Sequence, residues 1–105
     1  MQEYGNIAIV GERELVIGFR LLGVSHTYIA EGAEGVATLR ELMDSGKYSL
    51  IILSESIRKH MDRKLLDHVE NSTVPLIVFI PLPGGEEEES VEKFAKRVLG
   101  VDIGR

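Results

Sequence analysis

The chain has 105 residues, no cysteine and a formal net charge of −5. This length fits one domain, and without cysteine the chain has no disulfide framework, thiol nucleophile or thiolate metal site. The acidic balance, 17 Asp and Glu against 12 Lys and Arg, argues against nucleic-acid binding. The chain shows neither a signal-peptide pattern nor an apolar run near the ~20 residues that span a bilayer. We therefore expect a cytoplasmic protein with at most an indirect link to a membrane.

Three short apolar runs, at residues 7–10, 50–53 and 76–80, are rich in β-branched residues and do not alternate with polar ones. Such runs are typical of strands that are buried on both faces. A weaker run at residues 27–30 predicts a more exposed strand.

Helical patterns separate these strands. The spacing of apolar residues predicts helices over residues 12–22, 36–44, 57–70 and 90–99, with Ser54 as the N-cap of the third. Alternating strands and helices favour parallel pairing, with helices on both faces of the sheet. By analogy with flavodoxin-like and receiver domains, we expect an α/β fold with four parallel strands in the spatial order 2-1-3-4.

The stretch from Pro81 to Glu89 holds two prolines, two glycines and four consecutive glutamates. Proline and glycine disfavour regular structure, and the glutamates repel one another. We therefore expect a flexible acidic loop. It divides the chain into a flavodoxin-like α/β domain at 1–82 and a segment at 83–105 that carries the C-terminal helix. That segment is either part of the same domain or a mobile appendage.

The sequence offers no recognisable catalytic machinery. The turn after the first strand, Gly11-Glu12, lacks the further glycines of a dinucleotide cradle, and no P-loop pattern occurs. The histidines at 26, 60 and 68 do not have the i, i+4 spacing of a helical metal site, and no acidic third member accompanies Ser25 and His26. We expect no catalytic residue, cofactor or metal.

A response-regulator receiver is the sharpest alternative to a protein-binding role. A receiver needs acidic residues after the first strand and an acceptor Asp after the third. Glu12 fits the first requirement, but Ser54 occupies the acceptor region. A receiver-like or ligand-binding signalling domain stays open as the alternative function.

Four stretches of the chain resemble the F subunit of the V/A-type rotary ATPases. The first stretch is the predicted strand 7–10 with its Gly11-Glu12 turn and the helix that follows, which carries Gly18-Phe19-Arg20-Leu21. The other three are residues 50–57, the run 75–81 that is bracketed by prolines, and residues 90–103, which end in a Gly-x-Asp-Ile pattern. The resemblance covers nearly the whole chain. Ser54 departs from the family's usual Thr but keeps a hydroxyl.

The resemblance implies a non-catalytic component of the rotor's central stalk, peripheral to the membrane. Such a component binds the coiled-coil D subunit and contacts the catalytic A and B subunits. It helps to couple rotation to ATP synthesis or hydrolysis and ion transport, and its C-terminal helix is linked to regulation of ATPase activity. We expect the partner interface to include Gly18, Phe19, Val91, Phe94, Ala95, Val98, Leu99, Val101 and Ile103.

Overall fold

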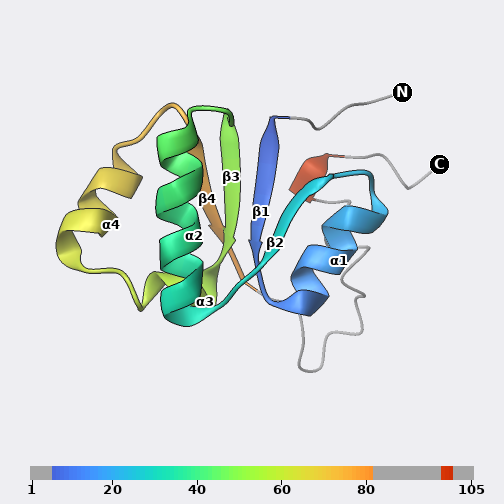
Figure 1. The fold of residues 1–105 in the computed structure, drawn as a ribbon, viewed down its shortest axis with the longest axis horizontal. Helices are drawn as coiled ribbons and strands as arrows, with labels where there is room; N and C mark the ends of the chain where they lie inside the picture. The colour runs from blue at the N-terminus through green and yellow to red at the C-terminus, as the bar shows by residue number, and fades with distance from the viewer. Residues whose placement is uncertain (1–5, 82–97, 101–105) are drawn as a thin grey trace.

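The computed structural model describes residues 6–81 and 98–100. Its four strands are β1 (Ile7–Gly11), β2 (His26–Ile29), β3 (Leu50–Ser54) and β4 (Leu76–Ile80). They form one sheet in the order β2-β1-β3-β4, and every neighbouring pair is parallel (Figure 1). The predicted fold class and strand order are confirmed, and each strand lies within one residue of its predicted bounds.

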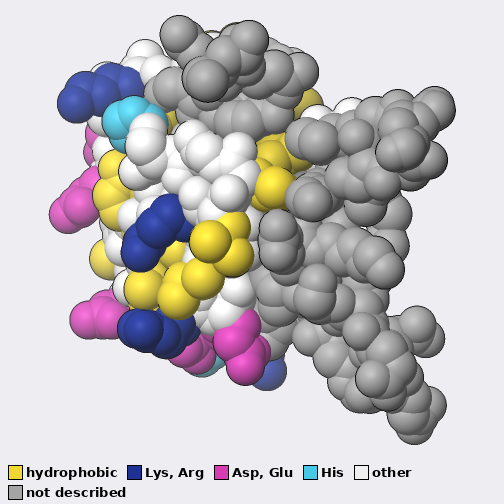
Figure 2. Space-filling model, turned by 90° about the vertical axis from the view of Figure 1, so that its right-hand side faces the viewer, with side chains coloured by type: hydrophobic (Ala, Val, Ile, Leu, Met, Phe, Trp, Pro, Cys, Tyr) yellow, Lys and Arg dark blue, Asp and Glu magenta, His cyan; other side chains and the backbone are white. Residues whose placement is uncertain are grey.

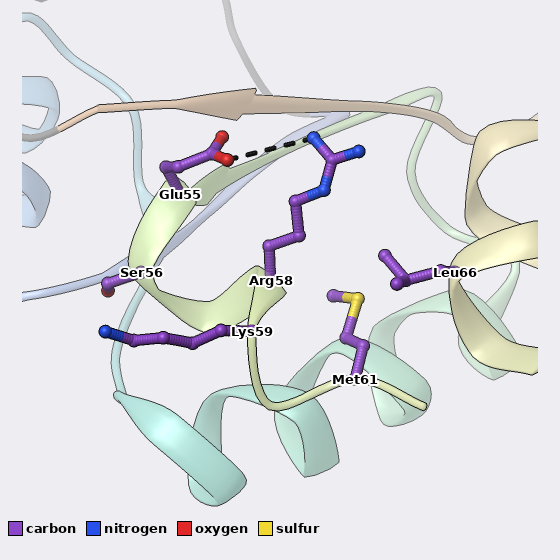
Figure 3. Close-up of a pocket in the computed structure, with 6 residues that line it drawn as sticks. All are labelled: Glu55, Ser56, Arg58, Lys59, Met61 and Leu66. Carbon is purple, nitrogen blue, oxygen red and sulfur yellow. Dashed lines mark ion pairs between the residues drawn. The ribbon is translucent and has the colours of Figure 1, made fainter. Parts of the chain in front are cut away.

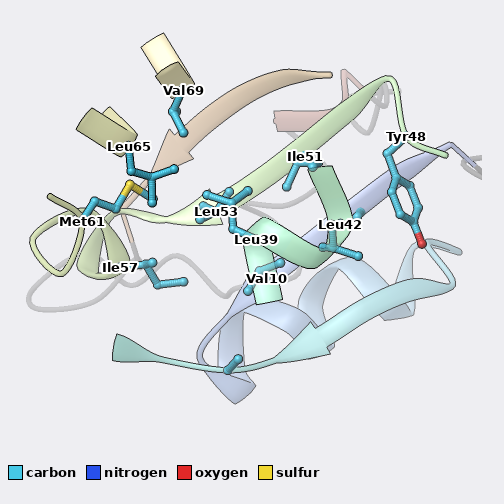
Figure 4. Packing of buried hydrophobic residues seen from close by; sticks show 12 residues of the cluster. Val10, Leu39, Leu42, Tyr48, Ile51, Leu53, Ile57, Met61, Leu65 and Val69 are labelled. Carbon is cyan, nitrogen blue, oxygen red and sulfur yellow. The ribbon is translucent and has the colours of Figure 1, made fainter. Parts of the chain in front are cut away.

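The helices are α1 (Arg13–Leu21), α2 (Gly32–Ser45), α3 (Glu55–Arg58) and α4 (Arg63–Glu70). They cover both faces of the sheet, so the two central strands are buried on both sides. Successive residues of β3 show this alternation. Ile51 and Leu53 pack with residues of α2, α3 and α4, whereas Ile52 packs with residues of α1. Figure 4 shows the first of these two clusters, with Leu39 of α2 and Leu65 of α4 directed towards the side chains of β3.

One predicted helix is wrong, because residues 57–70 do not form a single helix. The helix α3 ends at Arg58, and α4 begins at Arg63. Between them, the N–H groups of His60 and Met61 bond back to carbonyls three residues earlier, at 3.0 and 3.1 Å. Asp62 then starts a new helix, because its Oδ1 accepts a hydrogen bond from the N–H of Leu65 at 2.8 Å.

The break could not be predicted from the sequence pattern, because the four-residue spacing of apolar residues continues across it. The turn directs Met61 into the same core cluster that the two helices contact. All four residues of the pattern are therefore buried, as a continuous helix would also require: Ile57, Met61, Leu65 and Val69.

The helix α2 begins at Gly32, four residues before its predicted start. Its first turns contain Gly35, which packs tightly against α3. A Cβ at position 35 would lie 2.7 Å from Cδ1 of Ile57. The close approach of two helices requires glycine at this position, although glycine is a weak helix former. The helix ends at Ser45, one residue beyond the predicted bound, and Gly46 closes it in the left-handed conformation at φ 69°.

Several predictions fall outside the described residues. They are the acidic loop at 86–89, the boundary between residues 82 and 83, and most of the predicted helix 90–99. Of that helix, the structure describes Val98 and Leu99, and both are helical.

Candidate functional site

The carboxyl ends of β1 and β3 lie side by side, and three polar side chains meet there. The hydroxyl of Ser56 donates a hydrogen bond of 2.5 Å to Oε2 of Glu12, and it lies 3.1 Å from the hydroxyl of Ser54. Ser54 also accepts a bond from the N–H of Ser56 at 3.4 Å, which confirms it as the N-cap of α3. These bonds connect the turn that begins α1 to the turn that begins α3.

The glycine that precedes Glu12 is required by close packing. A Cβ at Gly11 would lie 2.9 Å from Cδ2 of Leu15 and 3.0 Å from Cβ of Ser54. In an open α/β sheet, this end of the strands is where ligands usually bind. Here the turn is filled by neighbouring side chains and has an acidic residue where a phosphate cradle would present further glycines.

Glu12 is an ionised carboxylate in this cluster. Burial favours its neutral form, but hydrogen bonds from Ser54, from Ser56 and from its own backbone outweigh burial and hold the pKa of Glu12 below its ordinary value. Its second oxygen, Oε1, is buried and has no hydrogen-bond partner among the described residues. A carboxylate with a lowered pKa is a weak base, so this arrangement ties two turns together better than it moves protons.

Sequence reasoning missed Ser56. Its bond to Glu12 spans 44 residues of chain, so no local pattern shows it. The predicted strand order was the one indication of this contact, because it already places the ends of the first and third strands next to each other.

The three histidines lie in separate places. The Nδ1 of His26, at the start of β2, lies 3.1 Å from the hydroxyl of Tyr48, which lies 3.0 Å from the hydroxyl of Tyr28. Burial and the hydrogen bond to Tyr28 raise the pKa of the Tyr48 hydroxyl to about 12. His60 lies in the turn after α3, and His68 lies on α4. Within residues 6–81 and 98–100, no group of three or more metal-binding side chains converges.

The predicted interface residues on α1 point into the domain. Gly18 is buried, and Phe19 is fully buried in the core cluster beneath α1. The exposed side of the helix carries Leu21, which is 66% exposed, and Arg20, whose guanidinium donates to Oγ1 of Thr27 at 2.9 and 3.1 Å. A role of Gly18 and Phe19 at a partner interface stays a prediction.

Of the predicted interface residues near the C-terminus, the structure describes two. Leu99 packs against the cluster that contains Phe19, and Val98 is 36% exposed. Two residues far apart in the sequence and both predicted to bind a partner, Phe19 and Leu99, therefore belong to one apolar cluster. The remaining predicted residues lie outside the described residues: Val91, Phe94, Ala95, Val101 and Ile103.

The surface on the side of α1 is mixed in character. On its described part, hydrophobic side chains lie between Lys or Arg and Asp or Glu side chains, and no uniformly basic area is visible (Figure 2).

A surface hollow of about 530 Å³ lies between α3 and α4. Figure 3 shows Met61 and Leu66 on one side of it and Arg58 and Lys59 on the other. The guanidinium of Arg58 pairs with Glu70 at 3.0 Å and with Glu55 at 3.7 Å. It also lies over the ring of Phe79, 5.1 Å from the ring centroid, and so joins the hollow to β4.

The parallel sheet, its strand order and the filled turn at its carboxyl end define a small doubly wound α/β domain. The family model described as ATP synthase (F/14-kDa) subunit matches residues 7–98. The chain belongs to this family.

Individual relatives agree with this assignment. The chain is 50% identical over 98 residues to the A-type ATP synthase F subunit of Thermoplasma acidophilum, covering 93% of this chain and 94% of that protein. It is 49% identical over 98 residues to the same subunit of Thermoplasma volcanium, with the same coverage. It is 36% identical over 99 residues to that of Methanocorpusculum labreanum, covering 92% of this chain and 96% of that protein. Among the described residues, no helix has the length and apolar character needed to cross a membrane.

Proposed function

We propose that this chain is a non-catalytic component of the central stalk of an A-type ATP synthase, where it binds the coiled-coil D subunit and rotates with it. The observation that carries the proposal is the similarity to A-type ATP synthase F subunits along more than nine-tenths of the chain. The filled turn between β1 and α1 supports a non-catalytic role, because a nucleotide would need backbone room there.

In this proposal the protein is cytoplasmic and reaches the membrane only through the complex. It helps to couple rotation to ATP synthesis or hydrolysis and to ion transport. The partner interface includes the apolar residues of the C-terminal helix together with α1, and the C-terminal helix regulates ATPase activity through contact with the D subunit or the catalytic A and B subunits. Leu99 packs against the core cluster that contains Phe19, which brings the end of the C-terminal helix next to α1.

Co-expression with the D subunit of the same organism tests the proposal. We expect the two chains to elute together from a size-exclusion column at micromolar concentration, and the isolated chain to hydrolyse no ATP. Addition of the chain to a complex assembled without it should change the rate of ATP hydrolysis. Separate elution of the two chains, or ATP hydrolysis by the isolated chain, would contradict the proposal.

A further inference from the structure

The strand β4 lies at one edge of the sheet and pairs only with β3 among the described residues. All five of its residues are apolar: Leu76, Ile77, Val78, Phe79 and Ile80. Leu76 is 51% exposed, the next three residues are partly exposed, and Ile80 alone is buried. Natural edge strands usually carry a charge that discourages pairing with another chain, and β4 carries none.

The hydrogen-bonding groups that face away from β3 can be assigned to particular residues. The N–H of Leu76 donates to the carbonyl of Ser49, immediately before β3, at 2.9 Å. The N–H and C=O groups of one strand residue point to the same side, and those of the next point to the opposite side. The N–H and C=O groups of Ile77 and Phe79 therefore face away from β3 and have no partner strand in the part of the chain that the structure describes.

A hollow for side chains lies beside this edge. The ring of Phe79 lies beneath the guanidinium of Arg58, which also lines the hollow between α3 and α4. The lining includes the apolar Met61 and the ammonium group of Lys59, which has no ion-pair partner among the described residues. Arg58 is already paired with Glu55 and Glu70, so of the two cations that line the hollow, Lys59 is the one without an ion pair within residues 6–81 and 98–100.

We propose that β4 binds an extended segment of the D subunit, the partner named in the proposed function, as a fifth strand of the sheet. The segment is mainly apolar, bonds to the backbone of Ile77 and Phe79, and places an apolar and an acidic side chain towards the hollow near Met61 and Lys59. Strand addition of this kind gains affinity from backbone hydrogen bonds and specificity from adjacent pockets. The proposal rests on the proposed function, in which the D subunit also contacts α1 and the C-terminal helix.

A second copy of the chain is a weaker candidate for this edge. Prolines at 75 and 81 bracket the strand and limit the paired stretch to residues 76–80. Stable interfaces between two chains use roughly 20–30 residues a side, far more than a five-residue strand offers. A short strand suits a segment that forms one part of a larger interface.

Amide hydrogen exchange measured by NMR tests this proposal, with the full chain alone and in complex with the D subunit. In the free chain, the amides of Ile77 and Phe79 should exchange quickly, whereas those of Val78 and Ile80, which face β3, should exchange slowly. In the complex, the Ile77 and Phe79 amides should slow by about tenfold or more, because they acquire partners.

Several outcomes would overturn the proposal. Unchanged exchange at Ile77 and Phe79 in a complex that elutes as one species would overturn it and leave the proposed function intact. Slow exchange at these amides in the free chain would show that the edge is already covered, by a second copy if the slowing depends on concentration and by this chain itself if it does not. Failure of the two chains to elute together would overturn both proposals.

A pair of matched variants gives a second measurement. Leu76→Lys places a charge on the β4 edge, and Ile29→Lys places one on β2, the opposite edge, at a side chain that is 48% exposed. A lysine on an edge strand discourages strand addition. We expect Leu76→Lys to raise the Kd for the D subunit by about tenfold and Ile29→Lys to leave it unchanged. An equal effect of both variants, or none, would contradict the assignment to β4.

Discussion

Replacing Phe19 by alanine should lower the free energy of unfolding of the isolated chain far more than any change on the exposed side of α1. The side chain is fully buried between α1 and the sheet, among neighbours that include Ile9 of β1 and Ile52 of β3. Truncation of a buried phenylalanine removes its transfer free energy and leaves a cavity, which together cost about 3–5 kcal/mol. Because small domains have a total stability of roughly 5–15 kcal/mol, this change removes a large part of it.

Urea unfolding followed by circular dichroism provides the assay, since the chain has no tryptophan for fluorescence. The free energy of unfolding of small proteins falls by ~1–3 kcal/mol for each mole per litre of urea, so the urea concentration at the unfolding midpoint should fall by more than about 1 M. Leu21→Ala is the matched control on the same helix, because that side chain is 66% exposed and its loss should change stability by no more than about 0.5 kcal/mol. A loss below about 1 kcal/mol for Phe19→Ala would refute the core role that the packing indicates.

Three further variants test other local contacts, each by urea unfolding. Asp62→Ala removes the side chain that caps α4 and should cost about 0.5–2 kcal/mol, whereas Asp62→Asn should cost much less; equal losses would contradict the cap. Gly35→Ala adds a Cβ 2.7 Å from Ile57 and should destabilise the chain by about 1–2 kcal/mol, as overpacking outweighs the gain in helix propensity. This loss should shrink in an Ile57→Val background, where Cδ1 is missing, and an undiminished loss would place the strain elsewhere. Because the pKa of Glu12 is lowered in the folded chain, its charge stabilises the fold above its ordinary pKa of 4.5, and this stabilisation is lost as pH falls through the lowered value. The wild type should therefore exceed Glu12→Gln in stability near neutral pH, and that advantage should shrink as the pH falls below 4.5; a constant difference would show that the charge is not responsible.

The strands were the most predictable part of the fold. Runs such as Leu50–Leu53 are apolar on both faces, and only a strand inside a sheet covered on two sides buries every residue of such a run. The break between α3 and α4 was not predictable from periodicity, because Met61 stays buried in the turn and keeps the four-residue spacing. The early start of α2 was also hidden, since the close approach of Gly35 to Ile57 is a tertiary contact that overrides the low helix propensity of glycine.

The candidate site was less predictable than the fold, for a physical reason. An apolar stripe on a helix shows that the stripe is buried, but the stripe alone does not distinguish the chain's own sheet from a partner. Phe19 belongs to such a stripe, and the structure places it against the sheet. The edge of β4 was easier to predict, because the run Leu76–Ile80 has the composition of a buried strand but the predicted strand order already places it last in the sheet. The structure confirms that order, and among the described residues β4 pairs with β3 alone.

The stretch Gly18-Phe19-Arg20-Leu21, on which the family resemblance partly rests, therefore serves two purposes. Gly18 and Phe19 face the sheet, whereas Arg20 bonds to Thr27 and Leu21 faces outward. A partner that docks on α1 of the folded domain meets the outward residues first. Loss of the proposed binding to the D subunit in a Phe19 variant would thus report on folding unless stability is measured beside it. A Leu21 variant that binds weakly at unchanged stability would report on the contact itself.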